Sequence, residues 1–116
     1  MPAKFSIDAF FQPTIAGGAN ANEVSPIVPN GKTFWVKKFG CFDPNTGDNI
    51  DSIILIQWGS TGSWNTIRAA GGGTHEFEIN SLFLGDGTKR FRILIQNKSG
   101  DEKTYGAWFS GVVRRV

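Results

Sequence analysis

The sequence predicts an all-β protein, an antiparallel sandwich of jelly-roll or Greek-key type with seven to eight strands. Polar and apolar side chains alternate through most segments, which is the period of a half-buried strand. Glycine supplies 15 of the 116 residues and aromatics 13%, a composition that favours short strands joined by tight turns. Turn signals recur at fairly regular spacing, and no segment carries the caps of a helix. The length fits a single domain, residues 1–116, and a partly closed barrel is the alternative.

The N-terminal third predicts one regular strand followed by irregular chain. Apolar side chains alternate with polar ones from residue 4 to residue 12, so a first strand begins almost at the initiator methionine. Residues 13–24 are turn-forming and offer little to bury, which predicts a surface loop that a partner could order. Pro26 and Pro29 allow only a short edge strand between them.

The middle of the chain predicts four strands. The apolar parity of residues 32–42 shifts midway, which predicts a bulge near Lys37 and Lys38. Residues 52–58 form a near-continuous apolar run, typical of a central strand covered on both faces. Residues 64–69 predict a short strand. In residues 74–80 the apolar side chains share one face and the glutamates share the other.

The C-terminal segment predicts two long strands. Residues 89–97 and 104–115 both alternate, and the polar link at 98–103 is short and contains glycine, so we expect an antiparallel hairpin. The parity places one set of isoleucine and phenylalanine side chains in the core. The expected core residues are Ile54, Ile56, Phe91, Ile93 and Ile95.

Composition excludes several classes of function. A net charge of +2 with 19% charged residues makes nucleic acid an improbable partner. A single cysteine, Cys41, excludes an internal disulfide, and a single histidine, His75, excludes a site that needs two imidazoles. The sequence shows no signal peptide and no run of about 20 apolar residues, so we expect no membrane span and synthesis in a reducing cytosol. A cytoplasmic location follows, unless the protein is part of a virion.

No group of residues predicts catalysis. Glu76 and Glu78 would lie roughly 6.5 Å apart on one strand face, but they lack the opposed arrangement that glycosidases use, so a solvated face is the better interpretation. His75 and Cys41 are interpreted as packed residues. We therefore assign no catalytic, cofactor-binding or metal-binding residue and expect no cofactor. A small hydrolase is kept as the third hypothesis for function.

The turn at residues 43–51 leaves one question of ligand binding open. Its oxygen-bearing side chains are spaced somewhat like those of a calcium loop, but the required glycine and the distal glutamate are missing. This favours an ordinary turn, and whether the loop binds calcium is not decided by the sequence. The oxygen-bearing residues are Asp43, Asn45, Asp48 and Asp51.

Interaction through aromatic and basic side chains is the strongest functional signal. Lys89, Arg90, Arg92, Arg114 and Arg115 would form one basic stripe if the last two strands paired, although a solvated surface is the simpler interpretation. Four tryptophans are many for this length and suit either packing or sugar stacking. Several aromatic residues, Phe10 among them, fall on the parity opposite the core, which predicts a homo-oligomer. The candidate interaction surface is Trp35, Phe42, Trp64, Trp108, Arg90 and Arg92.

The second half of the chain resembles small β-sandwich proteins of tailed-phage particles, the accessory head, fibre or tail components. The segments that carry this resemblance are residues 54–59, 84–97 and 105–111. It implies a non-enzymatic structural protein of the virion that forms symmetric homo-oligomers, with a trimer favoured. It also implies contact with other virion proteins or a host surface glycan, and it transfers no functional residue. A carbohydrate-binding module that uses exposed tryptophans is the alternative function.

Overall fold

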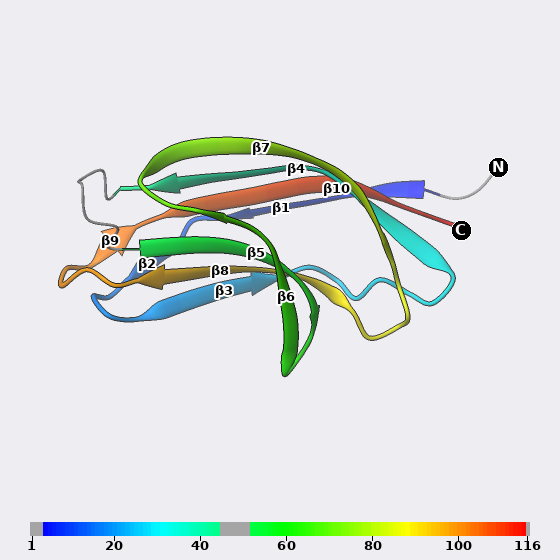
Figure 1. Cartoon of the computed structure of the whole chain (residues 1–116), viewed down its shortest axis with the longest axis horizontal. Coiled ribbons are helices and arrows are strands. Elements are labelled where there is room, and N and C mark those ends of the chain that lie inside the picture. Colours follow the sequence, from blue (N-terminus) through cyan, green and yellow to red (C-terminus); the bar gives the residue numbers. More distant parts are fainter. Residues whose placement is uncertain (1–3, 45–51, 116) are drawn as a thin grey trace.

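Two four-stranded antiparallel sheets pack face to face in the computed structural model, which describes residues 4–44 and 52–115 (Figure 1). The strand order is β1-β10-β4-β7 in one sheet and β3-β8-β5-β6 in the other, with β2 and β9 forming a small third ladder. Strands adjacent in a sheet are mostly distant in sequence, which is the crossed connectivity of a jelly roll. The predicted fold class is therefore confirmed. Among the described residues no helix is present, so none could cross a membrane.

The strands range from two to twelve residues. Their bounds are β1 Lys4–Phe11, β2 Thr14–Ile15, β3 Asn20–Val24, β4 Lys32–Asp43, β5 Ser52–Ser60, β6 Ser63–Ala70, β7 Gly73–Leu84, β8 Arg90–Asn97, β9 Lys103–Thr104 and β10 Gly106–Arg115.

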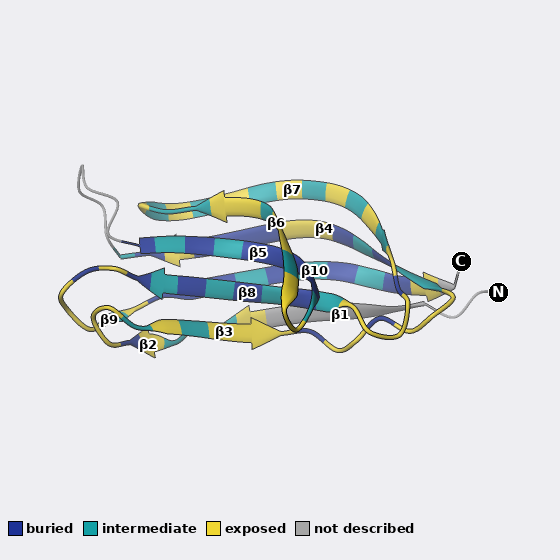
Figure 2. Ribbon diagram, turned by 60° about the horizontal axis from the view of Figure 1, so that its bottom comes forward, coloured by how far each residue is buried: buried dark blue, intermediate teal, exposed yellow. Residues whose placement is uncertain are grey.

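The core lies between the sheets and follows the predicted parity. Along β8 every second residue is buried, and the alternation of buried and half-buried positions is visible on β5 and β8 in Figure 2. The predicted core residues Ile54, Ile56, Phe91, Ile93 and Ile95 all have no exposed surface. Phe91 joins the two layers, since its ring lies 5.1 Å from that of Phe34 and 5.7 Å from that of Phe109.

The bulge predicted in β4 is present. The register between β4 and β7 shifts between Val36 and Lys38, and the register between β10 and β4 shifts between Ser110 and Gly111. The extra residue lets Phe34 and Val36 on one side of the bulge, and Phe39 and Cys41 on the other, all face the core.

The predicted C-terminal hairpin is wrong. Although β8 and β10 follow one another, β8 pairs with β3 and β5, and β10 pairs with β1 and β4. Each strand has one apolar face, and both faces are buried when the strands lie in opposite sheets across the core. The polar link at 98–103 therefore crosses between layers, and β9, which begins at its last residue, pairs with β2.

Asn97 holds this crossing in place. Its side-chain amide donates to the carbonyl oxygens of Ile15 and Asp101, both at 2.9 Å, and its side-chain oxygen accepts from the hydroxyl of Ser99 at 2.7 Å. The residue is 1% exposed, so water cannot reach the backbone groups around it. The side-chain amide of Asn97 supplies the hydrogen bonds that these backbone groups would otherwise lack.

Two further expectations need correction. The segment 13–24 is not all loop, because Asn20–Val24 forms the edge strand β3 and Ala19 and Ala21 pack against the core. Short polar strands are tolerated at sheet edges because they resist pairing with other chains. The strand β5 is central in its sheet but is fully buried on one face only, since Ile53 and Leu55 are half-buried on the other.

Candidate interaction surfaces

The six residues predicted as an interaction surface lie on two opposite sides of the sandwich. We call the outer surface of the β1-β10-β4-β7 sheet the β4 face, and that of the β3-β8-β5-β6 sheet the β8 face. Trp35, Phe42 and Trp108 lie on the β4 face. Trp64, Arg90 and Arg92 lie on the β8 face. The structure therefore brings them together as two groups of three.

One end of the β4 face carries three aromatic side chains, Phe10, Trp108 and Phe42, which we call the aromatic patch. Phe10 is 68% exposed and Phe42 45%. The rings of Phe10 and Trp108 are stacked, with centroids 6.4 Å apart and planes at 26°. The indole of Trp108 lies over Gly40, where a Cβ atom would overlap it. The patch is thus flat, apolar and open to solvent.

The other end of the β4 face is a mixed apolar and cationic surface. Leu82 and Leu84 on β7 are 56% and 63% exposed. Trp35 faces Leu82 across the strand pair, and the cationic groups of Lys37 and Arg114 lie 5.1 and 5.6 Å from its ring centroid. Such contacts let a tryptophan remain half-buried at an exposed position.

An ion pair separates the two apolar ends of the β4 face. The ammonium group of Lys38 lies 3.5 Å from a carboxylate oxygen of Glu76, and both side chains are about half exposed, at 50% and 54%. Glu78 lies on the same face of β7, two residues along. Glu76 and Glu78 therefore lie side by side on an exposed strand face. They do not face each other across a cleft, which is the arrangement that glycosidases use.

The β8 face holds a network centred on Arg92. Its Nε and Nη2 atoms donate to the side-chain oxygen of Gln57 at 2.9 and 2.7 Å. The amide nitrogen of Gln57 donates in turn to the hydroxyl of Thr66 at 3.1 Å. The guanidinium carbon lies 4.4 Å from the centroid of the Trp64 ring. The guanidinium is therefore fixed both along one edge and across one face.

The single basic stripe expected from pairing of the last two strands is wrong. Arg90 and Arg92 belong to β8, whereas Arg114 belongs to β10 in the other sheet. The side chains of Arg92 and Arg114 contact different tryptophans on opposite faces. No continuous basic track for a nucleic-acid backbone forms from these residues.

The side chains of His75 and Cys41 are packed against other parts of the protein. The His75 ring is stacked on Phe77 with centroids 6.1 Å apart, and its Nε2 atom lies 3.0 Å from the carbonyl oxygen of Gly71. Cys41 has no exposed surface, and burial is the main cause that raises the pKa of its thiol to about 11. A thiol that stays protonated at neutral pH is a poor nucleophile.

Of the four oxygen-bearing residues in the turn at 43–51, Asp43 lies within the described residues. It is buried, accepts a hydrogen bond from the Ser52 hydroxyl at 2.5 Å and another from the Gly72 amide at 3.0 Å. Positions 45, 48 and 51 lie outside the described residues. Within residues 4–44 and 52–115, no three histidine, cysteine or acidic side chains gather as metal ligands would.

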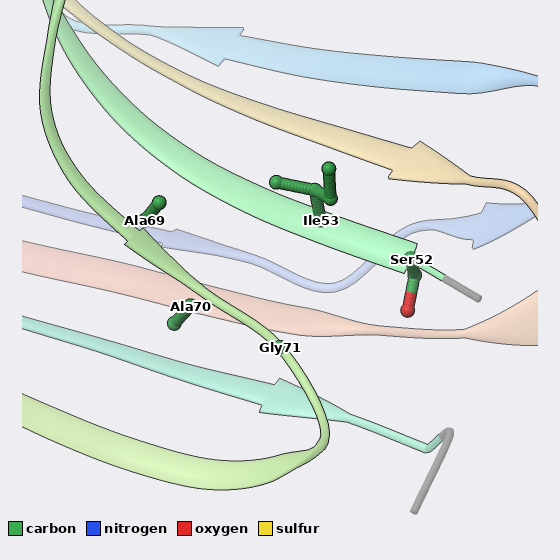
Figure 3. Close-up of a pocket in the computed structure, with 5 residues that line it drawn as sticks. All are labelled: Ser52, Ile53, Ala69, Ala70 and Gly71. Atoms are coloured by element: carbon green, nitrogen blue, oxygen red, sulfur yellow. The ribbon is translucent and has the colours of Figure 1, made fainter. Parts of the chain in front are cut away.

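A hollow of about 340 Å³ lies between the start of β5 and the end of β6 (Figure 3). Its walls are small and mostly apolar: Ser52, Ile53, Ala69, Ala70 and Gly71. Ser52, which contributes a hydroxyl, donates it to Asp43. The hollow therefore presents mainly apolar walls, and its lining includes neither Arg92 nor a residue of the aromatic patch.

Sequence reasoning missed Gly40 and Gln57. Gly40 lies between Lys38 and Phe42 on the solvent-facing parity, and a glycine at such a strand position was the signal that a ring from the neighbouring strand lies across it. Gln57 interrupts an apolar run and shares the outward parity of Ile53 and Leu55. The role of the Gln57 side chain cannot be predicted without knowing the neighbouring strands, because its hydrogen-bond partners Arg92 and Thr66 lie opposite it on β8 and β6.

No family model matches the sequence, and no curated protein matches it by sequence. Solved structures match it by fold. The Yersinia pseudotuberculosis-derived mitogen is 16% identical with a TM-score of 0.58, covering 92% of this chain and 86% of that one. A chain of the cyanophage Pam1 capsid is 15% identical with a TM-score of 0.54, covering 99% and 85%. A Bacillus endospore appendage protein, from a family of disulfide-linked pili, is 12% identical with a TM-score of 0.54, covering 100% and 91%. At these identities the likeness shows that the chain shares their β-sandwich jelly-roll fold.

Proposed function

We propose that this protein is a single-domain, non-enzymatic structural component of a viral particle, and that it assembles with copies of itself through the β4 face. One observation carries the proposal. Among the described residues, four of the six exposed large hydrophobic side chains lie on this one face, and they are Phe10, Phe42, Leu82 and Leu84. Monomeric proteins rarely leave such side chains gathered on one surface.

The β4 face has the size of a stable interface. Four strands about 4.8 Å apart, with up to twelve residues of about 3.3 Å rise, give a surface on the order of 20 by 35 Å. This is close to the ~800 Å² that each partner contributes to a standard interface. Aromatic residues such as Phe10 and Trp108 are also enriched in interface cores.

The charges on the β4 face suit pairing with a copy of itself. Lys38 and Glu76 place both signs beside each other between the apolar ends. A surface that carries both signs can meet an identical surface without leaving like charges opposed, and the polar strip would fix the register of the two copies.

A virion location and a phage source rest on resemblance. The cyanophage capsid chain shares the fold over most of both chains, and the segments at 54–59, 84–97 and 105–111 resemble tailed-phage accessory proteins. A head decoration, fibre or tail component would need no catalytic group. The resemblance favours a trimer, in which the β4 face of each chain would meet a different surface of the next chain, whereas two β4 faces that meet each other form a dimer. The mass from light scattering distinguishes the two. Other virion proteins or a host surface glycan would be its further partners.

Light scattering across a dilution series tests the assembly. We expect a mass of several chains that persists at low micromolar concentration. A doubly substituted variant, Phe10→Ser with Phe42→Ser, should shift the mass toward one chain. The matched control is Val24→Ser with Ile27→Ser, since these side chains are 37% and 45% exposed but lie off the β4 face. A wild-type mass of one chain at ~100 μM, far above the range in which a standard interface dissociates, would refute the proposal.

A carbohydrate-binding module is the second candidate, and the structure favours Trp64 as its tryptophan. Trp35 lies beneath two cationic side chains, and Trp108 is stacked with Phe10 in the aromatic patch. Trp64 also has a cation over its ring, the guanidinium of Arg92 at 4.4 Å, but that guanidinium belongs to a network of amide and hydroxyl groups, which are the groups that recognise sugar hydroxyls and charges. A glycan panel that shifts tryptophan emission in the wild type and not in Trp64→Phe would support it.

A further inference from the structure

Arg92 is a guanidinium held in place without a charged partner. Arginine at a protein surface is usually free to move, and fixing it costs side-chain entropy. Here Gln57 holds two of its nitrogen atoms and Trp64 covers one of its faces. In the part of the chain that the structure describes, no carboxylate lies within 4 Å of Arg92, and the ion pair present is Lys38 with Glu76 on the opposite face. Its charge is therefore not neutralised within the sandwich.

The hydrogen bonds to Gln57 leave three of the five N–H groups of the guanidinium available. The group has five N–H donors, and Gln57 accepts one from Nε and one from Nη2. The second Nη2 hydrogen and both Nη1 hydrogens remain. One from each nitrogen points along the end of the fork, which is the arrangement that binds two oxygens of a carboxylate, sulfate or phosphate at once.

The next row of the sheet widens the site. Arg90, Gly59 and Trp64 are register partners across β8, β5 and β6, so they share the β8 face beside Arg92. The position above Gly59 is closed by the β5–β6 hairpin, because a Cβ atom at Gly59 would overlap the carbonyl oxygen of Ser63 and lie 3.1 Å from the Cα atom of Trp64. A ligand bound to Arg92 would have Arg90 two residues away along β8 and Trp64 beside it on β6, without entering the position above Gly59.

We propose that Arg92, with Arg90 and Trp64, binds the carboxylate or sulfate group of an acidic saccharide. Two arginines on one strand face, one of them held by the amide of Gln57 next to the hydroxyl of Thr66, suit one anionic group among sugar hydroxyls. A nucleic acid would instead need a run of cations spaced to meet successive phosphates. The proposal does not depend on assembly through the β4 face, because none of its residues lies there.

NMR titration of the ¹⁵N-labelled full chain tests the site. The probes are N-acetylneuraminic acid for a carboxylate and galactose 6-sulfate for a sulfate, with galactose as the neutral sugar and sodium sulfate as the bare anion. We expect the acidic sugars to shift the Trp64 indole N–H and the Arg92 Nε–H signals in a saturable way. Galactose and sodium sulfate should bind at least about tenfold more weakly than the acidic sugar, because each supplies only one part of the recognition.

Two variants identify the group responsible. Arg92→Lys keeps the charge but loses the two-pronged donor, and it should weaken binding by about tenfold or more. Gln57→Glu has nearly the same shape and gives Arg92 an internal counter-ion, so it should abolish binding while the fold is kept. Arg114→Lys is the matched control, since that guanidinium lies 5.6 Å from the Trp35 ring on the opposite face, and it should leave binding unchanged.

Several results would overturn the proposal. These are an absence of shifts at Trp64 and Arg92, equal binding of galactose or of sodium sulfate, or unchanged binding in both Arg92→Lys and Gln57→Glu. Tighter binding of a single-stranded oligonucleotide, with an affinity that falls steeply with salt, would assign the site to nucleic acid instead. Thermal melts of each variant show whether lost binding reflects a lost fold.

Discussion

The indole ring of Trp108 on β10 lies across the backbone of Gly40 on β4, its register partner in the sheet. Any side chain at position 40 would overlap the Nε1, Cε2 and Cζ2 atoms of the ring. The missing side chain therefore lets the indole lie flat, and its flatness in turn aligns it with Phe10 on β1. A glycine on one strand thus determines the shape of an aromatic surface built from two others.

Gly40→Ala should lift the Trp108 ring from the sheet. We expect the ring-current shift of the position-40 α-proton to disappear, and the variant to lose about 1–3 kcal/mol of stability from overpacking. NMR and urea denaturation measure the two effects. Gly106→Ala is the control, because a Cβ there would lie 3.6 Å from the Cβ of Phe42, an ordinary contact. Equal effects in both variants would contradict this role for Gly40.

Ile93→Ala should destabilise the core and Leu94→Ala should not, although the residues are adjacent. Ile93 has no exposed surface, whereas Leu94 is half-buried on the β8 face. Removing a buried isoleucine side chain to alanine costs about 2–5 kcal/mol, and the outward leucine should cost clearly less. The free energy of unfolding from urea titration compares the two. A melting temperature unmoved by Ile93→Ala would show that the parity of β8 is misassigned.

Stability should fall at high pH because of Cys41. Burial raises the pKa of its thiol from 9.0 to about 11, so the folded protein holds the proton more tightly than the unfolded chain does. The resulting stabilisation is complete below pH 9 and is lost as the pH rises toward 11. Cys41→Ala should show a shallower decline across this range, measured by urea denaturation at each pH. Equal slopes in the two proteins would argue against the shift.

Asn97→Ala should be among the most damaging polar substitutions. It would leave the carbonyl of Ile15 and the amide N–H of Ser99 without their side-chain partner in a buried site, while the Ser99 hydroxyl still donates to the carbonyl of Asp101. An unsatisfied buried group costs about 1–3 kcal/mol, so we expect a total loss of about 2–4 kcal/mol. Hydrogen exchange should also quicken in β2 and β9. Asn22→Ala, at an exposed position on β3, should change stability by less than about 0.5 kcal/mol.

Side-chain parity was sufficient to predict the core but not the strand pairing. The period of two identifies which face of β8 and of β10 is buried. Ile93 on β8 faces the core as expected, and Phe109 on β10 faces the core as well. Parity is the same whether two strands lie side by side or face each other across a sandwich. The short link at 98–103 favoured a hairpin, and the role of Asn97 in carrying the chain between sheets has no local sequence signature.

The candidate surfaces were predictable in the same partial way. The outward parity of Trp35, Phe42 and Trp108 was sufficient to place them on a solvent-facing surface. The partners of Arg92 were not predictable, because Gln57 and Trp64 come from strands far away in sequence and meet it only through the register of β5, β6 and β8. Grouping all six residues as one surface required the pairing that parity cannot supply.

The two outer faces of the sandwich point in opposite directions, and this has a consequence for avidity. An assembly that covers the β4 face turns every Arg92 outward, so the number of sites displayed equals the number of chains. Once one site on such a particle binds, the others act at the high effective concentration set by their spacing, and weak individual binding can be strengthened by about 10² to 10⁴-fold. A shallow site on a sheet surface, too weak for a monomer to use, would then suffice for attachment to a surface that carries many copies of the ligand.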